Sequence, residues 1–166
     1  MEEIILMDVY GKGEVQIPSN NHVNFLYKLL LERDLNYAIS HDGKTTFEQH
    51  KKFVEAIPYD SWNIIRLIDD GYLGRAIGSV YLTYENEIGI FILKEHQRKG
   101  YGKAALQKFI LECVYKTKWI NPYFLANIHP KNEASIKFFE SFGFKLIQNR
   151  IVLSVPSSVQ STYRLY

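Results

Sequence analysis

The chain has 166 residues, which suits a single domain, and 46% of them are apolar, which is enough for a sizeable core. Its formal net charge is only +2 and it contains no long basic run, so the composition argues against nucleic-acid binding. No stretch approaches the roughly eighteen consecutive apolar residues of a membrane span, so we expect no membrane association.

The N-terminus and the cysteine content indicate a reducing compartment. The chain starts with Met1, Glu2 and Glu3, a segment that is acidic where a secretory signal would be basic. Cys113 is the only cysteine, so no disulfide can form within the chain. We therefore expect a cytoplasmic protein with one domain over residues 1–166.

The first half of the chain predicts a strand and two helices. Residues 2–9 have a strand pattern, and Ser19 or Asn20 is expected to cap a helix that runs to about residue 33. Its expected apolar face consists of Val23, Leu26, Tyr27, Leu30 and Leu31. A second helix should begin at Thr45 or Thr46, with a capping box between Thr45 and Glu48.

Three antiparallel strands are expected next, over residues 61–69, 73–84 and 87–93. Asp69-Asp70-Gly71 and Glu85-Asn86 supply the turns between them. The third strand is apolar on both faces, which is typical of a strand buried on both sides.

The second half predicts a helix to about residue 115, a strand over 121–128, and a helix capped by Asn132 and stopped by Gly143. A hairpin over 144–155 and 160–166 should close the chain. This order predicts a mixed α/β (α+β) fold in which the strands at 87–93 and 121–128 form a right-handed parallel crossover.

Two glycines stand where the helix after the third strand begins. Gly100 and Gly102 let a ligand approach the backbone, and the unpaired N–H groups of a first helical turn carry about half a positive charge. With Arg98, Lys99 and Lys103 nearby, this pattern predicts an anion site of the kind that binds a pyrophosphate. A tight turn without a ligand is the alternative.

The stretch Gln97-Arg98-Lys99-Gly100-Tyr101-Gly102 resembles the Q/R-x-x-G-x-G/A signature of the GCN5-related N-acetyltransferase (GNAT) family. The segment from Asn132 to Phe144 is similar to that family's later N-x-x-[AS]-x-x-x-[YF]-x-x-x-G-F pattern. The two motifs cover roughly residues 87–144, and the N-terminal half matches the family only in its order of elements.

The resemblance implies a central mixed, mostly antiparallel sheet with a splayed parallel strand pair, flanked by helices. It implies acetyl-CoA as cosubstrate, with the pyrophosphate on the loop and the pantetheine arm paired like an added strand. The cofactor-binding residues that it implies are Ile90, Phe91, Ile92, Gln97, Arg98, Lys99, Gly100, Tyr101, Gly102, Lys103, Asn132 and Phe139.

Glu87 is the candidate catalytic base, because family members often carry a glutamate near this place that relays the amine's proton through water. A solvated carboxylate at a strand end is the alternative. Asn127, at the place of another family glutamate, cannot act as a base. Phe139 replaces a tyrosine that many members use to protonate the thiolate, which leaves Ser135 as a weak candidate donor.

The five histidines show no metal-ligand spacing, so no metal is expected. His41 and His129 are secondary acid/base candidates, and Cys113 lies on the apolar face of its helix as a core residue.

The expected function is direct acetyl transfer from acetyl-CoA to a primary amine of a small molecule or a protein N-terminus. The alternatives are a non-catalytic acetyl-CoA-binding domain and a dinucleotide-binding oxidoreductase, because residues 100–105 also satisfy G-x-G-x-x-[GA]. Amino sugars, polyamines, amino acids and protein N-termini all remain open as acceptors, and so does a homodimer. The acceptor site should draw on residues 34–47 and 155–158.

Overall fold

The computed structural model describes residues 2–11, 18–37, 45–116 and 123–147, and confirms a mixed α+β fold. The elements are β1 (Ile4–Asp8), α1 (Asn20–Leu31), η1 (Leu35–Tyr37), α2 (Phe47–Glu55), β2 (Ser61–Asp69), β3 (Tyr72–Leu82), β4 (Ile88–Ile92), η2 (Lys94–His96), α3 (Tyr101–Lys116) and α4 (Glu133–Glu140), the two η segments being single turns of 3-10 helix.

The four strands form one antiparallel sheet in the order β1-β2-β3-β4. A two-residue turn joins β2 to β3, with Asp70 at φ 48° and Gly71 at φ 80°. Two consecutive positive φ values give a turn whose twist matches that of the flanking strands. The turn therefore fixes the register in which Asp69 pairs with Tyr72.

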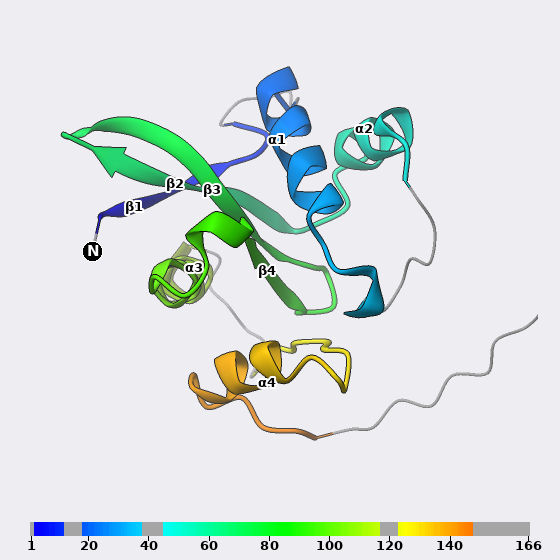
Figure 1. Ribbon diagram of the computed structural model, residues 1–166, viewed down its shortest axis with the longest axis vertical. Coiled ribbons are helices and arrows are strands. Elements are labelled where there is room, and N and C mark those ends of the chain that lie inside the picture. Colours follow the sequence, from blue (N-terminus) through cyan, green and yellow to red (C-terminus); the bar gives the residue numbers. More distant parts are fainter. Residues whose placement is uncertain (1, 12–17, 38–44, 117–122, 148–166) are drawn as a thin grey trace, which may run out of the picture.

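The sheet separates two hydrophobic cores (Figure 1). On one face α3 packs through Ala105, Leu106 and Phe109 against a core that includes Ile88 and Ile92 of β4. On the other face α1 and α2 cover a second core that is rich in aromatic rings. Because side chains alternate along a strand, β4 contributes its even-numbered residues to the first core and its odd-numbered residues to the second face.

The prediction of a regular strand over residues 121–128 is wrong for the part of that range that the structure describes. Leu125 forms a single parallel bridge with Glu87, and residues 123–128 form no further ladder. Phe124, Ala126 and Ile128 still pack against the α3-side core. The apolar alternation that predicted a strand therefore reflects side-chain burial, which does not require a paired backbone.

Several expected boundaries also shift. The capping box on α2 joins Thr46 to Gln49, not Thr45 to Glu48. On α1 the cap is Ser19, while Leu29 is buried and Leu31 is 65% exposed, so the apolar face is rotated from the expected one. The rotation follows from the α2 contact, because α1 packs both on the sheet and on a neighbouring helix.

Two further differences lie near chain turns. β3 ends at Leu82 because Thr83 begins the turn, where its hydroxyl accepts the N–H of Glu87 at 3.1 Å. Residues 144–147 contain no strand, and the rest of the expected closing hairpin lies outside the described residues. Within the part of the chain that is described, no helix is long and apolar enough to cross a membrane.

His50 is a buried polar side chain where α2 meets α1. It is 5% exposed, its ring lies 5.4 Å from that of Tyr27, and its Nε2 has no hydrogen-bond partner within the described residues. Burial lowers the pKa of His50 below its ordinary value of 6.5, so the ring stays neutral in the folded protein near neutral pH.

We expect the free energy of unfolding to decrease as the pH falls below about 6.5, because the unfolded chain then binds a proton that buried His50 does not. The variant His50→Gln should lose this part of the pH dependence. Urea unfolding at a series of pH values measures both slopes. A variant with the wild-type slope would show that His50 takes up its proton in the folded state as well.

Candidate active site

The loop between β4 and α3 exposes a cluster of backbone N–H groups. Arg98 has φ 59° and Gly100 has φ 86°, so two left-handed residues bend the chain sharply before α3. The first helical bond runs from Ala104 N to Gly100 O at 3.1 Å, so the N–H groups of residues 101–103 precede the helical ladder. Arg98, Lys99, Gly100 and Lys103 are all exposed. The loop is therefore an exposed, positively charged turn.

Gly102 is not required by the packing of the chain itself. A β-carbon built on it would lie 3.5 Å from Cε2 of Phe138 and 3.7 Å from Cγ1 of Ile92, which are ordinary contact distances. Its φ is also not in the left-handed region. A helical glycine costs about 1 kcal/mol relative to alanine, and the contacts of the described residues do not explain why a glycine stands here.

Two residues of the motif use their side chains to hold the loop. Gln97 donates from Nε2 to the carbonyl oxygen of Ile92 at 2.8 Å. Tyr101 is buried, packs edge-on against His96, and donates its hydroxyl to the Glu2 carboxylate. This hydrogen bond raises the pKa of the Tyr101 hydroxyl above its ordinary value. Because its side chain is held in this way, Tyr101 can offer a ligand only its backbone N–H at the helix start.

The backbone of β4 alternates between two sides. Thr83 N donates to Glu87 O at 2.9 Å, and Leu93 N donates to Ile77 O at 2.9 Å, so the odd-numbered residues of this segment face β3. Phe91 belongs to this set. The family resemblance implied that the backbone groups of Phe91 pair with the cofactor like those of Ile90 and Ile92, but the ladder directs them toward β3.

The other edge of β4 is open beyond its first residue. Ile88 N donates to Leu125 O at 2.8 Å, which closes the bridge to the segment after α3. Within the described residues no strand pairs with Ile90 or Ile92 on this edge, although Ile92 O accepts from Gln97. Such an edge can pair with an extended ligand that carries amide groups.

Glu87 and Asn127 meet at the start of this open edge. Glu87 forms the single backbone bridge with Leu125, and the side chain of Asn127 donates from Nδ2 to Glu87 Oε1. Glu87 is half-buried and Asn127 is exposed. The amide therefore holds one carboxylate oxygen and leaves the second oxygen available, a function for Asn127 that was not predicted from the sequence.

His129 lies near this pair, on the same segment. Its ring centroid is 5.9 Å from that of Tyr37, and its Nδ1 accepts the N–H of Lys131 at 3.2 Å. Nδ1 is thus occupied by a backbone N–H, which leaves Nε2 as the ring atom that can meet a substrate. His41, the other histidine candidate, lies outside the described residues.

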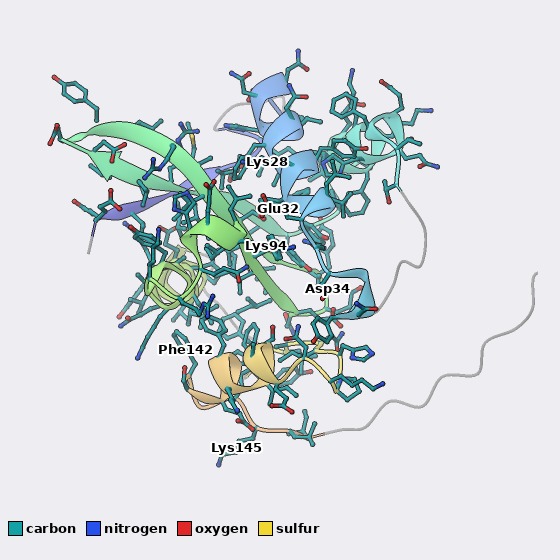
Figure 2. The ribbon with its side chains drawn as sticks, in the orientation of Figure 1. Lys28, Glu32, Asp34, Lys94, Phe142 and Lys145 are labelled. Carbon is teal, nitrogen blue, oxygen red and sulfur yellow. The ribbon has the colours of Figure 1, made fainter. Side chains whose placement is uncertain are left out.

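The α4 candidates divide between the surface and the core. Asn132 caps the helix, with Oδ1 accepting from Ser135 N at 3.1 Å. Ser135 is half-buried, whereas Phe139 is only 7% exposed, with its ring 5.1 Å from that of Phe144. Phe142 lies at the end of α4 that faces α3 (Figure 2), and Phe139 itself belongs to the core on the α3 side.

The end of α1 is fastened to the turn that precedes the loop (Figure 2). Glu32 accepts the N–H of Lys94 with Oε2 at 3.0 Å, so its carboxylate caps η2 from a distant element. Lys28 and Glu95 add an exposed ion pair at 3.9 Å. Exposed pairs contribute little, whereas a carboxylate on a helical N–H is a charge-assisted bond. Glu32 is therefore the main link between α1 and the loop.

No group of three or more His, Cys, Asp or Glu side chains that could hold a metal ion occurs within residues 2–11, 18–37, 45–116 and 123–147.

The family of the chain follows from a domain-model match. Residues 18–145 match the model described as "Acetyltransferase (GNAT) domain", which is more than half of the chain. The chain therefore belongs to the GNAT family of acetyltransferases, as the two sequence motifs indicated. A comparison with curated proteins gives no match.

Solved structures share this fold. A domain from Methanocaldococcus jannaschii superposes with a TM-score of 0.69 at 22% identity, covering 90% of this chain and 93% of that one. Spermidine N-acetyltransferase from Vibrio cholerae, in complex with CoA and spermine, gives 0.66 at 15%, covering 84% and 79%. AAC(6')-Iy, in complex with a bisubstrate analog, gives 0.57 at 17%, covering 94% and 99%.

We expect Glu32→Ala to increase hydrogen exchange at the Lys94 amide and in the loop that follows, because the amide loses its carboxylate partner. Glu32→Gln, which retains an acceptor oxygen, should show a smaller increase. Lys28→Ala, which removes only the exposed ion pair, is the control and should leave exchange in η2 near the wild-type rate. Equal exchange in Glu32→Ala and wild type would contradict the capping function.

Proposed function

We propose that the chain transfers an acetyl group from acetyl-CoA directly to a primary amine. The observation that carries the proposal is the edge of β4 that no described strand covers beyond Leu125, which leads to the exposed N–H cluster before α3. The family match supports the same assignment, and so does Gly102, where the protein's own packing would accept a β-carbon. The reducing cytoplasm remains the compartment that we propose.

The cofactor fits the residues that face it. The N–H groups around residues 98–103 would hold the pyrophosphate, with help from the side chains of Arg98, Lys99 and Lys103. The backbone groups of Ile90 and the N–H of Ile92 would pair with the pantetheine amides, since the Ile92 carbonyl already accepts from Gln97. Acetyl-CoA supplies the activated thioester, whose carbonyl carbon the amine attacks.

Glu87 would accept the proton that the amine must lose, since a free alkylamine has a pKa near 10. The carboxylate lies on the face of β4 that looks toward α1 and α2, while Asn127 fixes one of its oxygens. A water between the amine and the second oxygen would complete the relay. Asn127 is thus proposed as a positioning residue for the base.

No acetylated enzyme is needed for this reaction. Cys113 is 4% exposed and belongs to the α3-side core, which argues against its acting as a nucleophile. Phe139 has no hydroxyl and is buried, so any proton for the departing thiolate would come from Ser135 or from water.

A non-catalytic acetyl-CoA-binding domain is the second candidate, and the specific observation that favours it is Phe139 in place of a hydroxyl-bearing residue. The dinucleotide-binding alternative is not retained. Its fold needs a parallel, doubly wound sheet, whereas the four strands described here are all antiparallel.

Gly102→Ala tests the cofactor site in two directions. The added β-carbon fits the protein's own packing, so we expect the free energy of unfolding to stay equal or to rise by up to about 1 kcal/mol. The same carbon would crowd the pyrophosphate, so affinity for CoA should fall by roughly tenfold or more. Thermal unfolding and titration calorimetry measure the two effects.

Gly143→Ala is the matched control for this variant. Its β-carbon meets nothing within 4 Å, but φ is 87°, so the substitution should destabilise the protein while CoA affinity stays unchanged. If Gly102→Ala bound CoA as tightly as wild type, the proposed pyrophosphate site would be wrong.

Glu87→Gln should lower the rate near neutral pH by roughly 10²–10³, which is the usual range for loss of a general base. The rate should recover partly at alkaline pH, where more of the amine is already unprotonated. Asn127→Leu should give a smaller loss, because the base remains but is less well oriented. Steady-state rates over a pH series distinguish these outcomes, and a Glu87→Gln profile identical to wild type would leave Glu87 as a surface carboxylate.

A further inference from the structure

We infer that the acceptor amine carries a second, anionic group such as a carboxylate, and that Arg33 recognises it. This inference rests on the proposed acetyl transfer and names the class of its acceptor. Arg33 follows α1 directly, and its Cζ lies 5.9 Å from the centroid of the Phe91 ring. The guanidinium thus stands over β4 on the face that looks toward α1 and α2.

Glu87 and Phe91 are odd-numbered residues of the same strand segment, so the candidate base and the ring below Arg33 lie on one face. Four residues of strand separate them by about 13 Å. An amine that reacts between them can therefore extend its other end toward Arg33. Figure 2 shows the two neighbours of Arg33 in sequence, Glu32 and Asp34, at this end of α1.

The positive charge of Arg33 is not neutralised by the carboxylates that flank it. Glu32 turns toward the Lys94 N–H at 3.0 Å. Asp34 accepts from the backbone and side-chain nitrogens of Asn36 at 3.0 and 2.9 Å. Within the described ranges of the chain, no ion pair joins Arg33 to a carboxylate. Both adjacent anions are engaged elsewhere, so the guanidinium remains available.

On this face of the sheet, tyrosine rings whose hydroxyl groups can donate hydrogen bonds accompany Arg33. Tyr59 and Tyr81 stack at 4.1 Å with an interplanar angle of 7°, and both are half-buried. The ring of Tyr81 covers Gly89, where any β-carbon would lie only 2.1 Å from it. Burial, then the neighbouring Tyr81, raises the pKa of Tyr59, so its hydroxyl stays protonated and can donate.

These groups favour an anion over a cation. A guanidinium binds a carboxylate with two parallel charge-assisted bonds, and phenolic hydroxyls can add further donors. A polyamine would bring a second ammonium group toward an unneutralised arginine. Repulsion between like charges then selects against it, which is how specificity against an alternative substrate commonly arises. The chain therefore differs in expected acceptor from a spermidine acetyltransferase of the same fold.

A matched series of amines tests this inference on the full chain. Each set has one reactive amine and the same number of methylenes, with a carboxylate, a carboxamide or a second amine at the far end; 6-aminohexanoate, 6-aminohexanamide and 1,6-diaminohexane form one set, and shorter chains and dipeptides complete the panel. We expect the carboxylate members to have the highest kcat/KM. Release of free CoA thiol measures the rates.

Arg33→Gln should lower kcat/KM for the carboxylate members by about tenfold, and Arg33→Glu should lower it further while raising that of the diamines. The carboxamide members should change by less than about threefold, because they bear no charge to lose. Lys145→Glu makes the same change in net charge on the far side of α4 (Figure 2), and it should leave the preference unchanged.

The outcomes separate this inference from the proposed function. Wild-type protein that binds CoA but acetylates the diamines faster, or acetylates no carboxylate member, would overturn the acceptor class and leave the cofactor site standing. An Arg33→Gln enzyme with wild-type preference would also overturn it. Wild-type protein that fails to bind CoA would overturn both.

Discussion

The structure depends on the incomplete pairing of one strand. β4 is fully paired with β3, but on its other edge the only backbone partner within the described residues is Leu125, at the start of the strand. A buried backbone without partners is costly, so an edge of this kind persists when water or a ligand can satisfy it. The same strand separates two sides of the molecule, because α3 and its loop lie on one face of β4 and α1 and α2 lie on the other.

Distant segments fix the loop that continues this edge. Glu32 of the α1 end caps η2, Glu2 accepts from Tyr101, and the carbonyl of Ile92 accepts from Gln97. Each contact uses a polar group to hold backbone that is bent through left-handed residues. Because a preorganised set of N–H groups binds an anion without further ordering, these supports reduce the entropic cost of binding. The shape of the proposed anion site thus depends on residues outside it, such as Glu32 and Glu2.

The sequence predicted what is local and missed what is distant. The bounds of β2 and the caps Ser19 and Asn132 follow from alternation and from side-chain chemistry within a few residues. The glycine motif likewise indicated the loop. By contrast, the Asn127–Glu87 bond spans 40 residues and the Glu32–Lys94 bond spans 62. No local pattern encodes such contacts, and apolar alternation cannot distinguish a paired strand from a buried unpaired segment such as that around Leu125.

The small net charge of +2 conceals two separate cationic regions. Arg98, Lys99 and Lys103 surround the start of α3, whereas Arg33 lies over Phe91 on the opposite face of the sheet. Because exposed charges more than about 10 Å apart are largely screened at physiological salt, charges on opposite faces of the sheet are expected to attract separate ligands. In the reaction that we propose, the acceptor would therefore be selected by the local balance of charge around Arg33, where Glu32 and Asp34 are already engaged, and not by the overall charge of the chain.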